Sequence, residues 1–253
     1  MSIFMENNGT LSHWRAGNGT GIFYPEGNVT VGGKTKLRGG APVCCPNFGI
    51  APTDGPYAGI SLPQHGLIRD ATVNRGRVGP NNRADLQFTP AREDDDYLGA
   101  DFIFKEPWRH RVRIMAKDYQ PQQQEIYGLS HCILLEAEVE MPYSIGFHPY
   151  FATAGGPFVL RNPGEEWRSE NLEVNKPFFT KRRLQGAFEI ELTHGTIELQ
   201  IKEGYTDYCI WTDRPDLYIC VEPVRVDHER RYLMLDAGEI QTCRCTIKYT
   251  PKT

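Results

Sequence analysis

Residues 196–202 read Thr-Ile-Glu-Leu-Gln-Ile-Lys, and apolar and polar side chains alternate strictly along this stretch. In an extended chain Ile197, Leu199 and Ile201 point to one side, and the polar residues between them point to the other. This period of two is typical of a strand with one packed face and one solvated face, as found in antiparallel sheets. The stretch therefore predicts β structure and disfavours an amphipathic helix.

The same alternation recurs along the chain, at 133–141, 188–193 and 242–249. Shorter apolar or β-branched runs predict further strands near 21–24, 84–89, 98–104, 110–116, 158–161, 207–211, 217–222 and 232–235. Glycine and proline number 25 and 18, where average usage in a chain of this length gives about 30 together. So many helix breakers leave little room for long helices. The sequence predicts an all-β antiparallel fold, and 253 residues suit a single domain over 1–253.

Composition excludes several functional classes. The chain carries 28 Lys and Arg against 32 Asp and Glu, a net charge of −4, so it has no basic surplus for binding nucleic acid. No apolar run reaches the roughly 18–20 residues that cross a bilayer, and the first residues lack the pattern of a signal peptide. We therefore expect a cytoplasmic protein with no nucleic-acid or membrane partner. Oligomeric state cannot be predicted from the sequence.

The seven cysteines are odd in number, and their spacing matches neither a disulfide framework nor a zinc site. We expect free, packed thiols in a reducing compartment, and no metal or cofactor.

Four short motifs carry the residues suited to chemistry. Arg38 begins R-G-G-A-P, which leads into P-N-F-G at 46–49; His65 lies in P-Q-H-G-L-I-R at 63–69. His148 lies in F-H-P-Y-F, and Glu222 lies in V-E-P at the end of an apolar strand. Each motif alone could be a turn, a capped loop or a structural strand end. A carboxylate on an otherwise apolar strand, however, is either paired or functional.

Taken in order, these motifs resemble the aldose 1-epimerase (galactose mutarotase-like) superfamily, including its hexose-6-phosphate 1-epimerase branch. The resemblance spans roughly residues 20–249 and includes a closing L-M-L-D-A-G-E segment at 233–239. It implies a large antiparallel β-sandwich, often called a supersandwich. It also implies cofactor-independent interconversion of the α and β anomers of an aldose or aldose 6-phosphate.

The resemblance assigns roles to individual residues. Glu222 would be the general base that takes the proton from the C1 hydroxyl, and His148 the general acid that protonates the ring oxygen. The ring would open to the aldehyde, rotate about C1–C2 and close on the other face. Both groups must lie within hydrogen-bond reach of the C1–O5 edge. The predicted substrate-binding residues are Arg38, Gln64, His65 and Arg69, with Phe147, Tyr150 and Trp211 either packing on the sugar or lying in the core. We expect the motif loops to meet at one end of the sandwich.

One departure from the family pattern leaves the function open. The family usually has an aspartate that holds ring hydroxyls, but residues 175–183 contain none, and Asp207 or Asp213 are only possible substitutes. A carbohydrate-binding or sensing protein without catalysis is therefore an alternative. A third hypothesis is another acid/base enzyme that acts on sugars. Glycosidases usually need two catalytic carboxylates, however, and Glu222 is the only good candidate in this sequence.

The choice between a free and a phosphorylated sugar also stays open. Arginines suit phosphate, and Arg75, Arg77 and Arg83 add to those of the motifs within the irregular segment 38–83. The F-H-P-Y-F motif favours a free sugar instead.

Overall fold

The computed structural model describes residues 2–6, 8–69, 73–74, 77–78, 98–120, 126–182 and 186–252. Within these residues the chain forms strands joined by turns and two short 3₁₀ helices, η1 (Gly55–Tyr57) and η2 (Ser169–Asn171). No helix in this part of the chain is long and apolar enough to span a bilayer. All of the paired strands described are antiparallel.

One sheet has eight strands in the order β15-β14-β17-β18-β22-β10-β9-β8. These strands are β8 (Leu98–Phe104), β9 (His110–Tyr119), β10 (Tyr127–Ala137), β14 (Val159–Asn162), β15 (Glu165–Arg168), β17 (Phe188–Leu192), β18 (Gly195–Glu203) and β22 (Ile240–Pro251). Buried and more exposed residues alternate along β18, as the opening stretch predicts. The buried side faces the main core.

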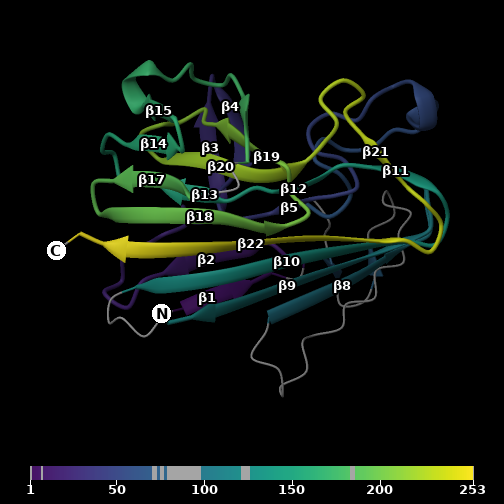
Figure 1. Cartoon of the computed structure of the whole chain (residues 1–253), viewed down its shortest axis with the longest axis horizontal. Coiled ribbons are helices and arrows are strands. Elements are labelled where there is room, and N and C mark those ends of the chain that lie inside the picture. The colour runs from purple at the N-terminus through teal and green to yellow at the C-terminus, as the bar shows by residue number, and fades with distance from the viewer. Residues whose placement is uncertain are drawn as a thin grey trace.

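The second large sheet has the strand order β16-β19-β20-β12-β5, with β13 also paired to β20. Its strands are β5 (Val43–Cys44), β12 (Ile145–Phe147), β13 (Tyr150–Ala152), β16 (Phe178–Lys181), β19 (Asp207–Trp211) and β20 (Tyr218–Arg225). Figure 1 shows these shorter strands lying over the long strands of the eight-stranded sheet. Residues from both sheets share one hydrophobic core, so the two sheets form a β-sandwich.

Smaller pairs complete the described chain. They are β1 (Ser2–Met5) with β2 (Leu11–Arg15), β3 (Gly27–Val31) with β4 (Lys34–Arg38), β6 (Val73–Asn74) with β7 (Arg77–Val78), and β11 (Met141–Tyr143) with β21 (Leu233–Leu235).

Two strand predictions need correction. The stretch 133–141 is not one strand, because β10 ends at Ala137 and β11 begins at Met141 after a turn. The stretch 21–24 forms only isolated bridges, from Gly21 to Arg15 and from Phe23 to Phe151. Ile22 and Phe23 are buried without a continuous ladder, whereas Val139 lies exposed in the turn between β10 and β11. The predicted strand at 84–89 lies outside the described residues.

All seven cysteines are described, and each is buried and free of disulfides. This confirms the prediction of free, packed thiols.

Candidate active site

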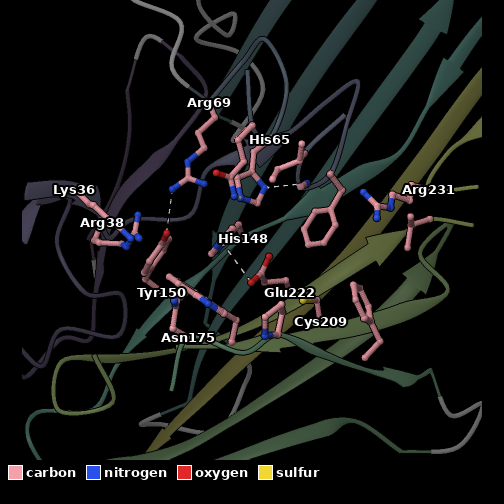
Figure 2. A pocket seen from close by; sticks show the side chains of 18 of the residues that line it. Lys36, Arg38, His65, Arg69, His148, Tyr150, Asn175, Cys209, Glu222 and Arg231 are labelled. Atoms are coloured by element: carbon pink, nitrogen blue, oxygen red, sulfur yellow. Dashed lines mark hydrogen bonds and ion pairs between the residues drawn. The ribbon is translucent and has the colours of Figure 1, made fainter. Parts of the chain in front are cut away.

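Strand register places His148 opposite Glu222. On one side of His148, Gly146 of β12 pairs with Val224 of β20; on the other, Tyr150 of β13 pairs with Cys220. His148 lies midway between these two pairs, and Glu222 lies midway between their partners on β20. As a result, Nε2 of His148 is 3.5 Å from Oε1 of Glu222, the contact at the centre of Figure 2.

Strand β20 is buried on both faces. Ile219 and Val221 belong to the main core between the sheets, whereas Tyr218 and Cys220 belong to a separate small cluster. Glu222 shares the face of this second cluster, because side chains two apart on a strand point the same way. The candidate site therefore lies on the outer face of the six-stranded sheet. The expected position at one end of the sandwich was wrong.

Backbone hydrogen bonds hold the Arg38 motif against the His148 motif. The N–H of His148 donates to the carbonyl of Pro42 at 2.9 Å, and the N–H of Tyr150 donates to the carbonyl of Gly40 at 2.9 Å. Arg38 is the last residue of β4, directly before this junction. These two hydrogen bonds hold two motifs side by side that are about 110 residues apart in the sequence.

The His65 loop is fixed by a close approach of backbone to backbone. Gly66 has φ +86, and a Cβ on it would lie 2.1 Å from the carbonyl oxygen of Cys45, so only glycine fits here. The N–H of Leu67 donates to that same carbonyl at 2.9 Å, and the N–H of His65 donates to the carbonyl of Gly49 at 2.8 Å. The loop therefore presents His65 in one defined position.

These segments surround one cavity of about 780 Å³. All six residues predicted to act on or bind the substrate line it: Arg38, Gln64, His65, Arg69, His148 and Glu222. Figure 2 shows Lys36 and Arg38 at one side of the cavity, Arg231 at the other, and the His148–Glu222 pair between them. The structure brings the six residues together, while their individual roles stay predictions.

Burial sets the protonation of the central pair. Burial raises the pKa of Glu222 well above its usual value, and the Arg69 cation offsets this in part. Burial lowers the pKa of His148 well below its usual value, and Arg69 and His65 act in the same direction. Both shifts favour the uncharged form of each group. Burial therefore favours a neutral carboxyl beside a neutral imidazole over the ion pair of the two groups.

Two atoms of this pair lack a hydrogen-bond partner among the described residues. They are Nδ1 of His148 and Oε2 of Glu222, and both are buried. Buried polar atoms in folded proteins are nearly always satisfied, so unsatisfied atoms facing a cavity indicate a place for a ligand.

His65 is a neutral hydrogen-bond donor. The backbone N–H of Gly49 donates to its Nδ1 at 3.2 Å, which leaves the proton of the neutral ring on Nε2. Burial, with the nearby Arg69 and Arg38 cations, lowers the pKa of His65 to about 3. The ring is therefore uncharged at neutral pH. Its Nε2 lies 3.2 Å from Nε2 of Gln64, and since both atoms carry hydrogen in this tautomer, a hydrogen bond forms between them only when the Gln64 amide presents its oxygen instead.

Arg38 is held by a buried carboxylate. Its Nη2 donates to Oδ2 of Asp213 at 2.7 Å, and its Nε donates to the same oxygen at 3.2 Å. The hydroxyl of Tyr218 donates to Oδ1 of Asp213. The guanidinium also lies over the ring of Trp211, 5.1 Å from its centre. Burial lowers the pKa of Arg38, but the bond to Asp213 outweighs it, so the net pKa is raised.

The two aspartates considered as substitutes are both already paired. Asp213 positions Arg38, and Asp207 forms an ion pair with Lys181, 2.8 Å between Nζ and Oδ1, and accepts a hydrogen bond from the hydroxyl of Thr206 at 2.7 Å. Neither lines the cavity. The residue that does line it from this region is Asn175, held in place by the bond from its backbone N–H to the carbonyl of Thr212.

Of the aromatic residues, Tyr150 and Trp211 line the cavity, whereas Phe147 is a core residue stacked on His131. The sequence search missed Lys36, Asn175 and Arg231. Of these three, the sequence pointed only to Asn175, because it begins the segment 175–183 in which the resemblance implies a sugar-binding aspartate. Arg75 and Arg83 lie outside the described residues, as does the side chain of Arg77.

Comparison with solved structures defines the fold. Slr1438 from Synechocystis sp. PCC 6803 superposes with a TM-score of 0.67 at 17% identity, covering 99% of this chain and 91% of that one. A galactose mutarotase-like protein from Lactobacillus casei ATCC 334 superposes with a TM-score of 0.68 at 13% identity, covering 97% and 95%. A protein from Escherichia coli K12, provisionally described as an aldose 1-epimerase, gives 0.54 at 15% identity, covering 99% of each.

These full-length matches show that the chain has the galactose mutarotase-like fold, and they confirm the predicted all-β sandwich. No protein-family model matches the sequence, and no curated protein matches it. At such low identity the likeness establishes the fold alone.

Proposed function

We propose that the protein is a cofactor-independent aldose 1-epimerase. The observation that carries this proposal is the buried His148–Glu222 pair, with 3.5 Å between Nε2 and Oε1, on the floor of a cavity large enough for a sugar. Anomer exchange needs one group that removes the O1 proton and another that protonates O5. Two such groups must reach the two oxygens bonded to C1, the exocyclic O1 and the ring oxygen O5, and this pair is spaced to do so.

The protonation of the pair suits the ring-opened intermediate. Ring opening starts from the ion-pair form, which the pair reaches when the proton of Glu222 moves to Nε2 of His148. The O1 proton then moves to Glu222, and the proton on His148 moves to O5. It therefore ends with a protonated carboxyl and a neutral imidazole. This is the state that burial favours for both groups. The site thus stabilises the pair as it stands after ring opening, and ring closure on either face returns the protons without exchange with solvent.

The surrounding side chains supply the contacts that orient a pyranose. Nε2–H of His65 can donate to a ring or hydroxyl oxygen, and the amide of Asn175 offers both donors and an acceptor for ring hydroxyls. Tyr150 and Trp211 present aromatic faces on the same side of the sheet. Asn175 takes the place that the resemblance gives to an aspartate.

The charge of the cavity favours a phosphorylated sugar. Its described lining includes four cationic side chains, Lys36, Arg38, Arg69 and Arg231, but only two carboxylates, Glu222 and Asp227. Arg38 is paired with Asp213, which leaves Lys36, Arg69 and Arg231 against Glu222 and Asp227 in a chain whose net charge is −4. We infer that an aldose 6-phosphate is turned over with a higher kcat/KM than the free aldose.

Magnetisation-exchange NMR on equilibrated glucose and glucose 6-phosphate tests the proposal directly. The native protein should accelerate α–β exchange of at least one of them, with the phosphate preferred. Glu222→Gln and His148→Ala should each lose the acceleration, whereas Glu229→Gln, an exposed carboxylate, should retain it. If the native protein binds the sugar saturably but does not accelerate anomer exchange, the enzyme proposal is wrong and the protein is a carbohydrate-binding protein.

A further inference from the structure

A third donor lies beside the acid–base pair. Cys220 precedes Glu222 by two residues on β20 and shares its face. Its Sγ, a ring nitrogen of His148 and a carboxylate oxygen of Glu222 all lie within 4.8 Å of one another. The three side chains are buried, and Nδ1 of His148 and Oε2 of Glu222 have no partner in the described chain.

This donor set is one that zinc takes. Zn²⁺ binds thiolate sulfur, imidazole nitrogen and carboxylate oxygen at about 2.0–2.3 Å, so tetrahedral donors lie roughly 3.3–3.7 Å apart. The 3.5 Å between His148 and Glu222 already meets this spacing. Cys220 Sγ lies within 4.8 Å of the other two ligand atoms, so the triangle must contract somewhat around an ion. Three protein ligands leave a fourth coordination position for water or another ligand.

Charge balance also suits a divalent ion. One thiolate and one carboxylate neutralise two positive charges, which removes the penalty of burying a net charge. When the ion binds, Cys220 releases its thiol proton and Glu222 releases its carboxyl proton to solvent. Soft thiolate ligation selects Zn²⁺ over Mg²⁺ or Ca²⁺, which prefer oxygen ligands.

We propose that His148, Cys220 and Glu222 form a zinc site at which the ion inhibits the protein. The inhibitory part rests on the proposed function, because the ion occupies the two groups that would transfer protons. The metal-binding part stands on the donor geometry alone. Cys209 provides a matched control: it lies directly opposite Glu222 on β19 and lines the cavity, but it is not in the donor triangle.

Titration of the metal-free protein with Co²⁺, a spectroscopic substitute for Zn²⁺, tests the site without any activity measurement. We expect one equivalent to give visible tetrahedral bands and a near-ultraviolet thiolate-to-cobalt band, both removed by Zn²⁺. Cys220→Ser should lose the thiolate band and weaken Co²⁺ binding at least tenfold, whereas Cys209→Ser should keep both. A native spectrum without the thiolate band, or a band that survives in Cys220→Ser, would overturn the site.

Inhibition is measured separately. Zn²⁺ should suppress anomer exchange by the native protein, a chelator should restore it, and Cys220→Ser should need at least tenfold more Zn²⁺ for the same loss. Co²⁺ binding through Cys220 that leaves exchange unchanged would overturn the inhibitory role. If the native protein shows no exchange at all, the cobalt spectrum still decides the metal site, and only the proposed function fails.

Discussion

The contact between Arg38 and Asp213 gives the most quantitative test of how the site is held. The Asp213 side chain is fully buried, and that of Arg38 is 12% exposed. Removing one partner of a buried ion pair costs about 3–5 kcal/mol, because the other charge is left uncompensated. Since Arg38 keeps some contact with solvent, we expect Asp213→Ala to lower the free energy of unfolding by about 3 kcal/mol, at the low end of that range.

A double-mutant cycle separates this pair from other effects of each change. Arg38→Met alone leaves the Asp213 carboxylate buried, still accepting from the hydroxyl of Tyr218 but without its cation. The double variant Arg38→Met/Asp213→Ala removes both charges together and should recover much of the loss. We expect a coupling energy of about 1.5–3 kcal/mol, the upper part of the range found for residues in direct contact.

Urea denaturation measures the free energy of unfolding of each variant, provided that the m-value is unchanged. The kinetics of anomer exchange measure the effect on KM and kcat. Freed from Asp213, Arg38 no longer lies fixed over Trp211, so Asp213→Asn should raise KM by about tenfold, equivalent to about 1.4 kcal/mol, with less effect on kcat. A coupling energy within about 0.5 kcal/mol of zero would refute the claim that Asp213 positions Arg38.

Three further outcomes follow from the site. Glu222→Gln should lose about 10²–10⁴-fold in exchange rate. It should unfold at an equal or higher urea concentration, because it replaces a buried ionisable group by a neutral isostere, and a loss of stability would contradict this. Arg69→Gln should move both limbs of the pH profile of kcat/KM to higher pH, since Arg69 lowers the pKa of both His148 and Glu222; limbs moving apart would refute it. Gly66→Ala should cost about 2 kcal/mol or more in urea unfolding and raise KM by displacing His65, and a native-like unfolding midpoint would disprove the close approach to Cys45.

The strands of the eight-stranded sheet were the easiest to predict. Along β18 and β22 one face meets the core and the other meets solvent, so hydrophobic residues alternate with polar ones. The short strands β5, β12 and β13 escaped prediction because they are buried on both faces and each spans only two or three residues. Such segments show no alternation of apolar and polar residues from which a strand could be predicted.

The candidate site was predictable where its residues lie in compact motifs, and His65, His148 and Glu222 are of this kind. Contacts between distant segments were not. Arg38 and Asp213 lie 175 positions apart, and no local pattern marks Asp213 as its partner. Lys36 and Arg231 reach the cavity only because the hairpin of β3 and β4 and the segment after β20 fold toward it. Their sequence surroundings are those of ordinary exposed cations.

Strand β20 shows why the centre of the site could be found from sequence. Its run Tyr-Ile-Cys-Val-Glu-Pro-Val is apolar on both faces except at Glu222, and both faces are buried. An unpaired charge in such a place is too costly to persist, so the carboxyl must either stay protonated or acquire a partner. The register supplies that partner by placing His148 directly across from it. A fold that only needed stability would gain by replacing this carboxyl with an apolar side chain. Its presence opposite an imidazole, beside a cavity, is the feature on which the proposed proton transfer rests.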